Sequence, residues 1–429
     1  MASYYDMNVN ERRELSTFYV LGAGFSRAIS PQMPLLPDLA TGVLGQLGLP
    51  RETLRPFDDN LEQWLSHISV DQPWLDDGGN LTNRAAFLRA SLAVRKCIES
   101  AEATAVESPP KLWLLRLAWD MCERQAKVAT FNYDLLLERA ASHARRVHTW
   151  TDLYGISLHG RYPVGTGPFF SPQPPPGNVF TLFKLHGSTN WGHGGMSGAT
   201  HEAIVLMRGD PAWRAPDAEG AHAARQRDTF LYDDLVPMIV PPTTTKNPYY
   251  GNTALRAQWR RAHDAMCAAR KVVIIGFSFP SSDLQVRHFM ATAVAPSTNV
   301  IVVDRRPESV STVRGLLPQA GEITSFIGDS AVSDYVNASC GDLIRWGMIY
   351  EPDGWDVALT VNGSNVLDEA VTLTKPWRSQ DGSSIGSWLK AEVARRWPSI
   401  DVEEATSDPD QPANASGHLS RIAYIPKTP

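Results

Sequence analysis

A short apolar segment, Phe18-Tyr19-Val20-Leu21, leads directly into Gly22-Ala23-Gly24. A buried parallel strand enters a helix in this way, because glycine permits a tight turn and lets a ligand approach the backbone closely. The free N–H groups at the start of the following helix favour a bound phosphate. We therefore predict the first strand and nucleotide-binding turn of a Rossmann-like fold, with a purely structural turn as the alternative.

Further strand-like segments alternate with helical ones along the chain. They span residues 127–131, 179–185, 236–240, 271–275 and 299–303, and a last helix–strand pair ends near Phe326. This alternation predicts an α/β fold with a doubly wound parallel sheet and right-handed crossovers.

The segments between and after these strands suggest insertions and an accessory unit. We predict a domain over residues 1–343, with a helical insertion at about 30–125 and a polar insertion at about 192–235. Residues 344–429 are predicted to form a small α+β unit with a flexible tail at 403–417. This unit contains five tryptophans: Trp346, Trp355, Trp377, Trp388 and Trp397. They form either an interface for a partner or the small core of the unit.

Composition restricts the class of protein. The 429 residues are 43% hydrophobic and 20% charged, which is sufficient for a substantial core. The formal net charge of −6 gives no basic signature, so direct nucleic-acid binding is not expected. Arg256, Arg260 and Arg261 could share one helix face, but such a cluster is more typical of a solvated surface.

The four cysteines form no C-x-x-C pair, so we expect no metal site and a reducing compartment. The polar N-terminus does not resemble a signal peptide, and no apolar run approaches the roughly 20 residues that span a bilayer. These features predict a cytoplasmic protein without membrane contact.

Two motifs place polar side chains at the ends of predicted strands. Asn132 and Asp134 follow the strand 127–131, and either could bind a ribose or simply cap the next helix. His186 follows the strand 179–185 and precedes a glycine, which predicts an exposed imidazole at the sheet edge. Imidazole titrates near neutrality and can act as a general base, although a lone histidine is more often structural.

Two later motifs repeat the pattern. Gly276 and Ser278 follow the strand 271–275, and Asp304, which can accept hydrogen bonds from a ribose diol, ends the strand 299–303. Either motif alone could be an ordinary turn. Since all of these motifs lie at predicted carboxyl ends of parallel strands, we expect one crevice to collect them.

In this order, the motifs resemble the sirtuin superfamily over roughly residues 15–330, and most closely its divergent bacterial branch from anti-phage defence. The resemblance implies NAD as ligand. The residues that match the family's phosphate loop are Gly22, Ala23, Gly24, Phe25 and Ser26. Asn132 and Asp134 match its Asn-x-Asp element, and His186 matches its catalytic histidine. Gly276 and Ser278 match a later nucleotide-contacting turn, and Asp304 falls near the adenosine ribose.

Two departures distinguish the chain from protein-deacylating sirtuins. It lacks the paired C-x-x-C motifs of their structural zinc, and Leu36-Pro37-Asp38-Leu39 lacks the Phe-Arg of their loop. The resemblance therefore implies an NAD hydrolase that cleaves the nicotinamide–ribose bond, with Asn132 and His186 as catalytic residues. The alternatives are an NAD-dependent protein deacylase and a non-catalytic sensor of NAD or ADP-ribose.

An enzyme that depletes NAD would need to be controlled. We expect a homo-oligomer, or activation by a partner. The resemblance suggests a helicase-like ATPase, a short Argonaute or a phage protein as that partner.

Overall fold

The structure is a computed structural model that describes most of the chain. It describes residues 16–144, 153–156, 159–160, 179–193, 204–206, 213, 236–243, 246–280, 283–351, 354–366, 371–374, 383–402, 405–408 and 419–427. Most of the predicted polar insertion at 192–235 lies outside these residues. So does most of the predicted flexible tail at 403–417.

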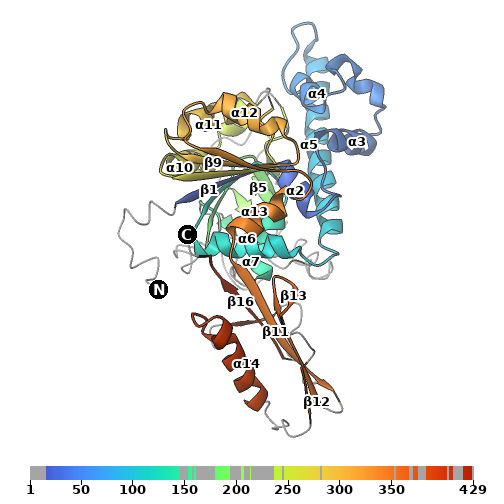
Figure 1. The fold of residues 1–429 in the computed structure, drawn as a ribbon. Helices are drawn as coiled ribbons and strands as arrows, with labels where there is room; N and C mark the ends of the chain where they lie inside the picture. The colour runs from blue at the N-terminus through green and yellow to red at the C-terminus, as the bar shows by residue number, and fades with distance from the viewer. Residues whose placement is uncertain are drawn as a thin grey trace.

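The main sheet of the described chain has six parallel strands in the order β10-β9-β8-β1-β2-β4 (Figure 1). The strands are β1 (Thr17–Leu21), β2 (Lys127–Thr130), β4 (Thr181–Lys184), β8 (Lys271–Ile275), β9 (Asn299–Asp304) and β10 (Ile323–Ile327). The chain runs outward from β1 to β4, returns to β8 on the other side of β1, and continues to β10. The predicted doubly wound sheet is confirmed, and its strand order reverses between β1 and β8.

Helices cover both faces of this sheet because successive side chains of a strand point to opposite sides. Tyr19 and Leu21 pack with one layer, whereas Phe18 and Val20 pack with the other. The first layer contains α2 (Ala23–Ile29), α6 (Leu112–Glu123), α7 (Leu136–His143) and α13 (Ala331–Ser339). The second contains α10 (Thr253–Cys267), α11 (Leu284–Ala293) and α12 (Glu308–Leu316). Burial of each large apolar side chain contributes roughly 1.5–3 kcal/mol.

A second, smaller sheet lies beside the first and was not predicted. It has the order β3-β6-β5-β7 and comprises β3 (His159–Gly160), β5 (Gly187–His193), β6 (Val205–Leu206) and β7 (Val236–Ile239), after which α9 (Asn247–Tyr250) follows. The placement of 236–240 in the parallel sheet was therefore wrong, because β7 pairs antiparallel with β5. The chain turns at Gly187, whose φ is +80°, and enters β5 immediately after β4.

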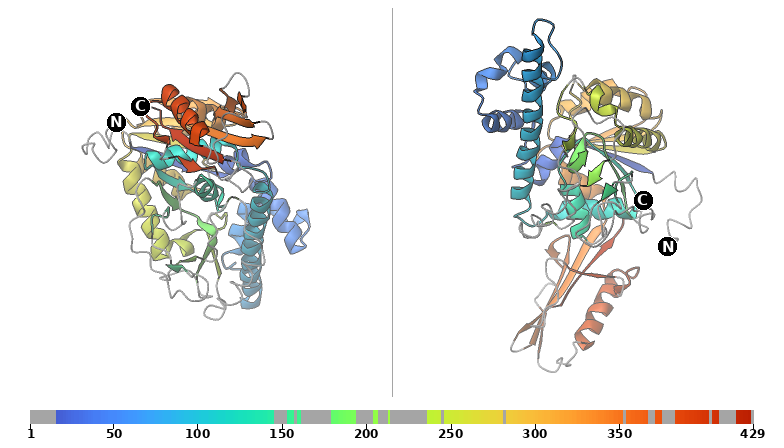
Figure 2. Two further views of the ribbon diagram at one scale, coloured as in Figure 1. Left: turned by 90° about the horizontal axis from the view of Figure 1, so that it is seen from below. Right: turned by 180° about the vertical axis from the view of Figure 1, so that it is seen from behind.

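The predicted helical insertion is confirmed. It contains α3 (Leu36–Leu47), a 3₁₀ helix η2 (Arg51–Phe57), α4 (Leu61–Ile68) and the long helix α5 (Asp77–Ala105), which stands beside the main domain (Figure 2). The side chain of Asn60 accepts hydrogen bonds at the start of α4, and that of Asp76 does so for α5. Such caps satisfy N–H groups that have no partner within the helix.

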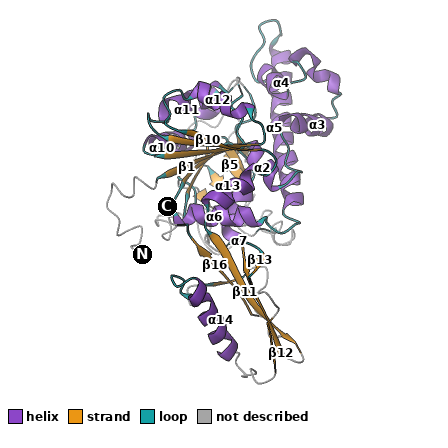
Figure 3. Cartoon of the chain, viewed as in Figure 1, coloured by secondary structure: helices purple, strands orange, loops and turns teal. Residues whose placement is uncertain are grey.

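The C-terminal unit combines an antiparallel sheet with one helix (Figure 3). Its elements are β11 (Asp342–Glu351), β12 (Gly354–Val361), β13 (Ser364–Asn365), β14 (Val371–Thr374), α14 (Ser383–Arg396), β15 (Thr406–Ser407) and β16 (Leu419–Ile425). Trp346 is buried in the small core, and Trp397 packs against it. Tyr424 anchors the unit to α6, since its hydroxyl donates to Asp120 Oδ1 at 2.9 Å and its ring stacks on Trp119.

None of the helices in the described ranges combines the length and apolar character that a bilayer crossing requires. Within the same ranges, His, Cys, Asp and Glu side chains form no group of three that could hold a metal ion.

Candidate active site

The glycine turn after β1 lies directly against the turn after β8. Gly22 N donates to Ile275 O at 3.0 Å, and Gly24 N donates to Gly276 O at 2.9 Å. This contact needs glycine on both sides, because a Cβ on Gly24 would lie 2.7 Å from Gly276 Cα. Open α/β sheets bind ligands at the carboxyl ends of the strands where the order reverses, and this turn pair occupies that position.

Asn132 joins the second motif to the first. Its Nδ2 donates to Gly22 O at 2.8 Å and to Ser26 Oγ at 2.9 Å. Ser26 Oγ in turn donates to Asp134 Oδ2 at 2.6 Å. Among the residues that the structure describes, none donates a hydrogen bond to Asn132 Oδ1, and the side chain is only half-buried. Two segments more than a hundred residues apart therefore meet at one point, which leaves an amide oxygen available.

Asp134 has a structural role as well. Its Oδ1 accepts a hydrogen bond from Leu136 N at the start of α7, so it caps that helix, whereas Asn132 does not. Burial raises the pKa of Asp134 to about 6; the Lys184 cation opposes this rise and the Glu102 carboxylate adds to it. Because Ser26 donates to the carboxylate, it favours the ionised form of Asp134.

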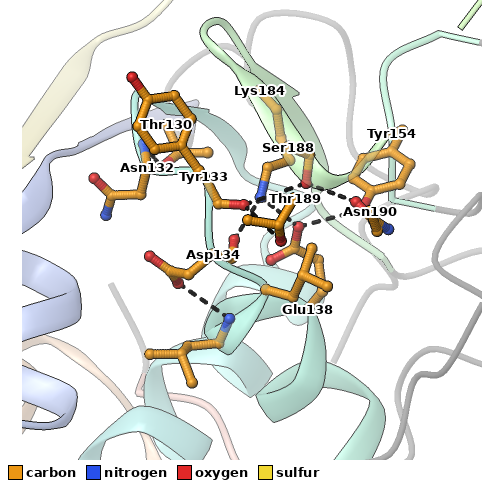
Figure 4. A network of polar contacts seen from close by, with 12 residues as sticks. Thr130, Asn132, Tyr133, Asp134, Glu138, Tyr154, Lys184, Ser188, Thr189 and Asn190 are labelled. Atoms are coloured by element: carbon orange, nitrogen blue, oxygen red, sulfur yellow. Dashed lines mark hydrogen bonds and ion pairs between the residues drawn. The ribbon is translucent and has the colours of Figure 1, made fainter. Parts of the chain in front are cut away.

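A buried polar network holds the loop 132–134 in place (Figure 4). Lys184 Nζ donates to Asp134 O at 2.5 Å and forms an ion pair with Glu138 at 2.9 Å. On the opposite side, Thr189 N donates to Tyr133 O at 3.0 Å. Strands β4 and β5 together hold the backbone of the loop that carries Asn132. The Asn132 side chain is therefore already positioned before any ligand binds.

His186 is buried rather than exposed, and the prediction of an imidazole at an open edge was wrong. Its side chain lies edge-on to Phe131, with ring centroids 5.0 Å apart, and its Nε2 has no hydrogen-bond partner among the described residues. Burial, reinforced by the nearby Lys246 cation and opposed by Asp283, lowers the pKa of His186 to about 3. The imidazole is therefore neutral at physiological pH, contrary to the expected titration near neutrality.

Phe131 connects His186 to the crevice. Its ring stacks on Phe277, which follows Gly276 in the turn after β8, at a centroid distance of 4.7 Å. Gly187 positions the histidine from the other side, because a Cβ there would lie 2.0 Å from Met238 O in β7. The imidazole thus packs against Phe131, which in turn stacks on Phe277 directly after the turn at Gly276.

The remaining predicted residues differ in how they face the crevice. Ala23 and Ser278 are exposed, and Gly24 and Gly276 are half-buried. The Phe25 side chain points into the core against Trp113, so only its backbone borders the turn. Asp304 Oδ1 accepts a hydrogen bond from Arg306 N at 2.9 Å, which makes it part of the turn after β9.

Sequence reasoning missed a buried ion pair close to His186. Lys246 Nζ lies 2.8 Å from Asp283 Oδ2, and both side chains are almost fully buried. Within the part of the chain that the structure describes, Asp283 Oδ1 and the hydroxyl of Tyr250 have no hydrogen-bond partner. Asp283 lies five residues after Ser278 and was not predicted to have a role, and nothing in the sequence around Lys246 indicated that this side chain would be buried.

Replacing Ser26 with alanine should destabilise the protein, because a buried Asp134 oxygen loses its partner. We expect the free energy of unfolding to fall by about 2 kcal/mol at pH 8. The loss should be smaller at pH 5, where Asp134, with a pKa of about 6, is largely protonated and needs the hydroxyl less. Urea denaturation at both pH values measures this. Ser311→Ala, on the exposed face of α12, is the control and should change stability by no more than about 0.5 kcal/mol. An equal loss for Ser26→Ala at both pH values would contradict the role of Ser26.

One family model matches part of the chain. The family model described as a SIR2-like domain matches residues 126–317. This range contains Asn132, His186 and Gly276 but begins after the glycine turn of β1, so it covers only part of the predicted extent 15–330. No curated protein matches the chain.

Solved structures of Sir2 enzymes also match, at low similarity. One described as "Sir2-p53 peptide-NAD+" is 13% identical, with 77% of this chain and 97% of that chain covered and a TM-score of 0.34. Another, described as "Structural Basis for the Mechanism and Regulation of Sir2 Enzymes", is 12% identical, with 76% and 96% covered and a TM-score of 0.34. The similarity to a SIR2-like domain is therefore confined to residues 126–317, which are less than half of the chain.

Proposed function

Since the chain is sirtuin-like and carries a SIR2-like domain over residues 126–317, we propose that it binds NAD at the crevice and hydrolyses its nicotinamide–ribose bond. The observation that carries this proposal is the junction at Asn132. The side chain ties the glycine turn to the Asn-x-Asp loop through Gly22 O and Ser26 Oγ, and its own oxygen accepts no hydrogen bond from the residues that the structure describes.

The residues at the crevice suit the parts of a dinucleotide. In the turn Gly22–Ser26, the N–H groups of Gly22, Gly24 and Phe25 already donate within the two turns, so the exposed Ala23 is the residue that would face the pyrophosphate. Ser278, which is also exposed, would extend the same surface from the turn after β8. Asp304 would accept hydrogen bonds from a ribose diol, since a carboxylate that accepts from Arg306 N retains acceptor capacity. His186 Nε2 is a buried polar atom that no described residue hydrogen-bonds, and a substrate hydroxyl or a water would satisfy it.

The chemistry asks little of the protein beyond positioning. The nicotinamide–ribose bond breaks with oxocarbenium character, and the neutral leaving group needs no strong acid. Asn132 Oδ1 orients the ribose or the attacking water, held by the network beneath the loop. His186, neutral throughout the physiological range, accepts a proton from the water directly or through a ribose hydroxyl. Phe131 and Phe277 shield the imidazole from bulk water.

Product analysis tests the activity. The purified chain is incubated with NAD, with and without the protein encoded beside it, and the products are separated by chromatography. We expect equimolar nicotinamide and ADP-ribose. The absence of any NAD loss in either arm would contradict the proposal, and cyclic ADP-ribose would revise the reaction.

His186→Ala should lower kcat for NAD cleavage by about 100-fold, at the low end for a general base because this imidazole is weakly basic. The ratio of wild-type to variant rate should be the same at pH 5.5 and pH 8, because His186 with a pKa of about 3 is neutral at both. Steady-state rates at the two pH values measure this. A ratio that falls at pH 5.5 would indicate an ordinary exposed histidine, and an unchanged rate would remove His186 from the mechanism.

The buried imidazole favours a second candidate, a sensor that binds NAD or ADP-ribose without turnover. Tight NAD binding without product, even with the partner present, would support it. Deacylation remains the other alternative, and nicotinamide release that depends on an acylated peptide would identify it.

We further propose that NAD loss serves anti-phage defence, as the resemblance to the defence-associated branch suggests. In that case activity is low until a partner, a phage protein or self-assembly releases it. Infected cells that carry the wild-type chain should lose NAD, whereas cells that carry Asn132→Ala should not.

A further inference from the structure

The helices α10 and α11 belong to the layer that covers the other face of the main sheet (Figure 1). A cavity lies between these two helices, away from the glycine turns. Its volume is about 540 Å³, which falls within the range of small-molecule sites. Neither Asn132 nor His186 lines it. Nothing in the proposed reaction uses it.

Two arginines and two histidines line the cavity. Arg256 and Arg260 lie one turn apart on α10 and are exposed, and His263 on α10 and His288 on α11 also line the cavity. None of the residues that line the cavity is acidic. The nearest carboxylate partner of His263, on Asp264, lies 3.9 Å away and points largely into solvent. Such a surface attracts an anion, and paired guanidinium groups suit a phosphate.

Aromatic side chains form the rest of the wall. Trp259 and Phe289 lie edge to face with ring centroids 5.2 Å apart, and Tyr250 contacts Trp259 at 5.4 Å. Trp259 remains half-exposed, so a planar ring can pack against it. A planar base and a phosphate are the two parts of a nucleotide. We propose that this cavity binds a mononucleotide, with its phosphate on Arg256 and Arg260 and its base against Trp259.

The structure also separates the arginines that are clustered in the sequence. Arg261 points away from the cavity and donates to Gly155 O beside the main sheet. Only the two arginines spaced by four residues share the cavity, and they provide a compact charge. This favours one phosphate group over the extended track of cations that a nucleic-acid strand requires.

The cavity touches the surroundings of His186 through Trp259. Trp259 Nε1 donates to Leu185 O at 3.0 Å, and the indole ring lies 6.3 Å from the His186 ring and 6.1 Å from that of Phe131. A nucleotide against Trp259 is thus one side chain away from the proposed catalytic base. We infer that the bound nucleotide alters the rate of NAD cleavage. This effect on the rate rests on the proposed function, whereas the proposal that the cavity binds a nucleotide does not depend on it.

Photolabelling locates the site directly. The full chain is irradiated with 8-azido-AMP in the presence of excess NAD, which occupies the crevice, and labelled peptides are mapped by mass spectrometry. We expect label on peptides from residues 249–263 or 284–292. In the double variant Arg256→Glu/Arg260→Glu, both the extent of this labelling and the affinity for AMP should fall by at least about tenfold. Arg314→Glu, an exposed arginine on α12, is the matched control and should retain both.

The outcomes separate the two proposals. Label confined to residues 16–30, or equal labelling of the double variant, overturns the nucleotide site. Binding of a ten-residue single-stranded oligonucleotide that the double variant loses, without AMP binding, also overturns it in favour of nucleic acid. Label at α10 and α11 in a chain that never cleaves NAD supports the site and contradicts only the proposed function. If cleavage occurs, saturating AMP should change its rate in wild type and in Arg314→Glu but not in the double variant.

Discussion

Asn132→Ala is expected to lower the rate of NAD cleavage by about 10³-fold, the largest loss of activity that we predict. The variant removes the oxygen proposed to orient the ribose or the water, and loss of one preorganised polar group in an active site typically costs 10²–10³-fold. It also removes both hydrogen bonds that tie the glycine turn to the loop 132–134, through Gly22 O and Ser26 Oγ. The second loss shifts the turn that holds the pyrophosphate, so the effect should reach the upper end of this range.

Single-turnover rates with saturating NAD measure the loss, with circular dichroism to confirm the fold. Asn60→Ala is the matched control, because this asparagine also binds the backbone but caps α4 in the helical insertion. That control should lose about 1 kcal/mol of stability and none of its activity. If Asn132→Ala cleaved NAD within about threefold of wild type, the junction would be structural, and the proposed mechanism would be wrong.

The sequence was sufficient to predict the main sheet because its strands are short, apolar and followed by glycine or polar residues. In β1, every residue from Phe18 to Leu21 is buried, and in β8 the same holds from Val272 to Ile275. Strands that are buried on both faces carry a strong local signal. The meeting of Gly22, Ser26 and Asn132 followed from topology, since the carboxyl ends of neighbouring parallel strands share one edge.

The sequence was not sufficient to predict the environment of His186, because that environment is made by segments remote from it. β5 reads as Gly-Ser-Thr-Asn-Trp, with polar residues that look like a loop, yet Ser188, Thr189 and Asn190 are fully buried. Their burial depends on hydrogen bonds to Tyr133 O and Tyr154 across the molecule, as in Asn190 Nδ2 to Tyr154 OH at 3.4 Å. Tertiary contacts of this kind leave no periodic pattern in a single sequence.

The other large effect is expected for Gly276→Ala, which should lower the free energy of unfolding by about 3 kcal/mol or more and prevent NAD binding. Gly276 has a φ of +61°, which disfavours a side chain, and a Cβ there would lie 2.3 Å from Phe25 N and 2.4 Å from Gly24 C. These are backbone atoms of the opposing turn, so no side chain can move aside, and the hydrogen bond from Gly24 N to Gly276 O must break. The turns of β1 and β8 then separate at the point where the pyrophosphate is proposed to bind.

Urea denaturation followed by tryptophan fluorescence, together with calorimetric titration of NAD, measures both effects of Gly276→Ala. Gly315→Ala tests the same substitution in α12, where a Cβ meets nothing within 4 Å. That control should gain about 0.5–1 kcal/mol, because alanine favours a helix over glycine. If Gly276→Ala matched wild type in both measurements, the two turns would not be in contact in solution. The crevice would then lose the close backbone packing on which every assignment of a phosphate to Gly22–Ser26 depends.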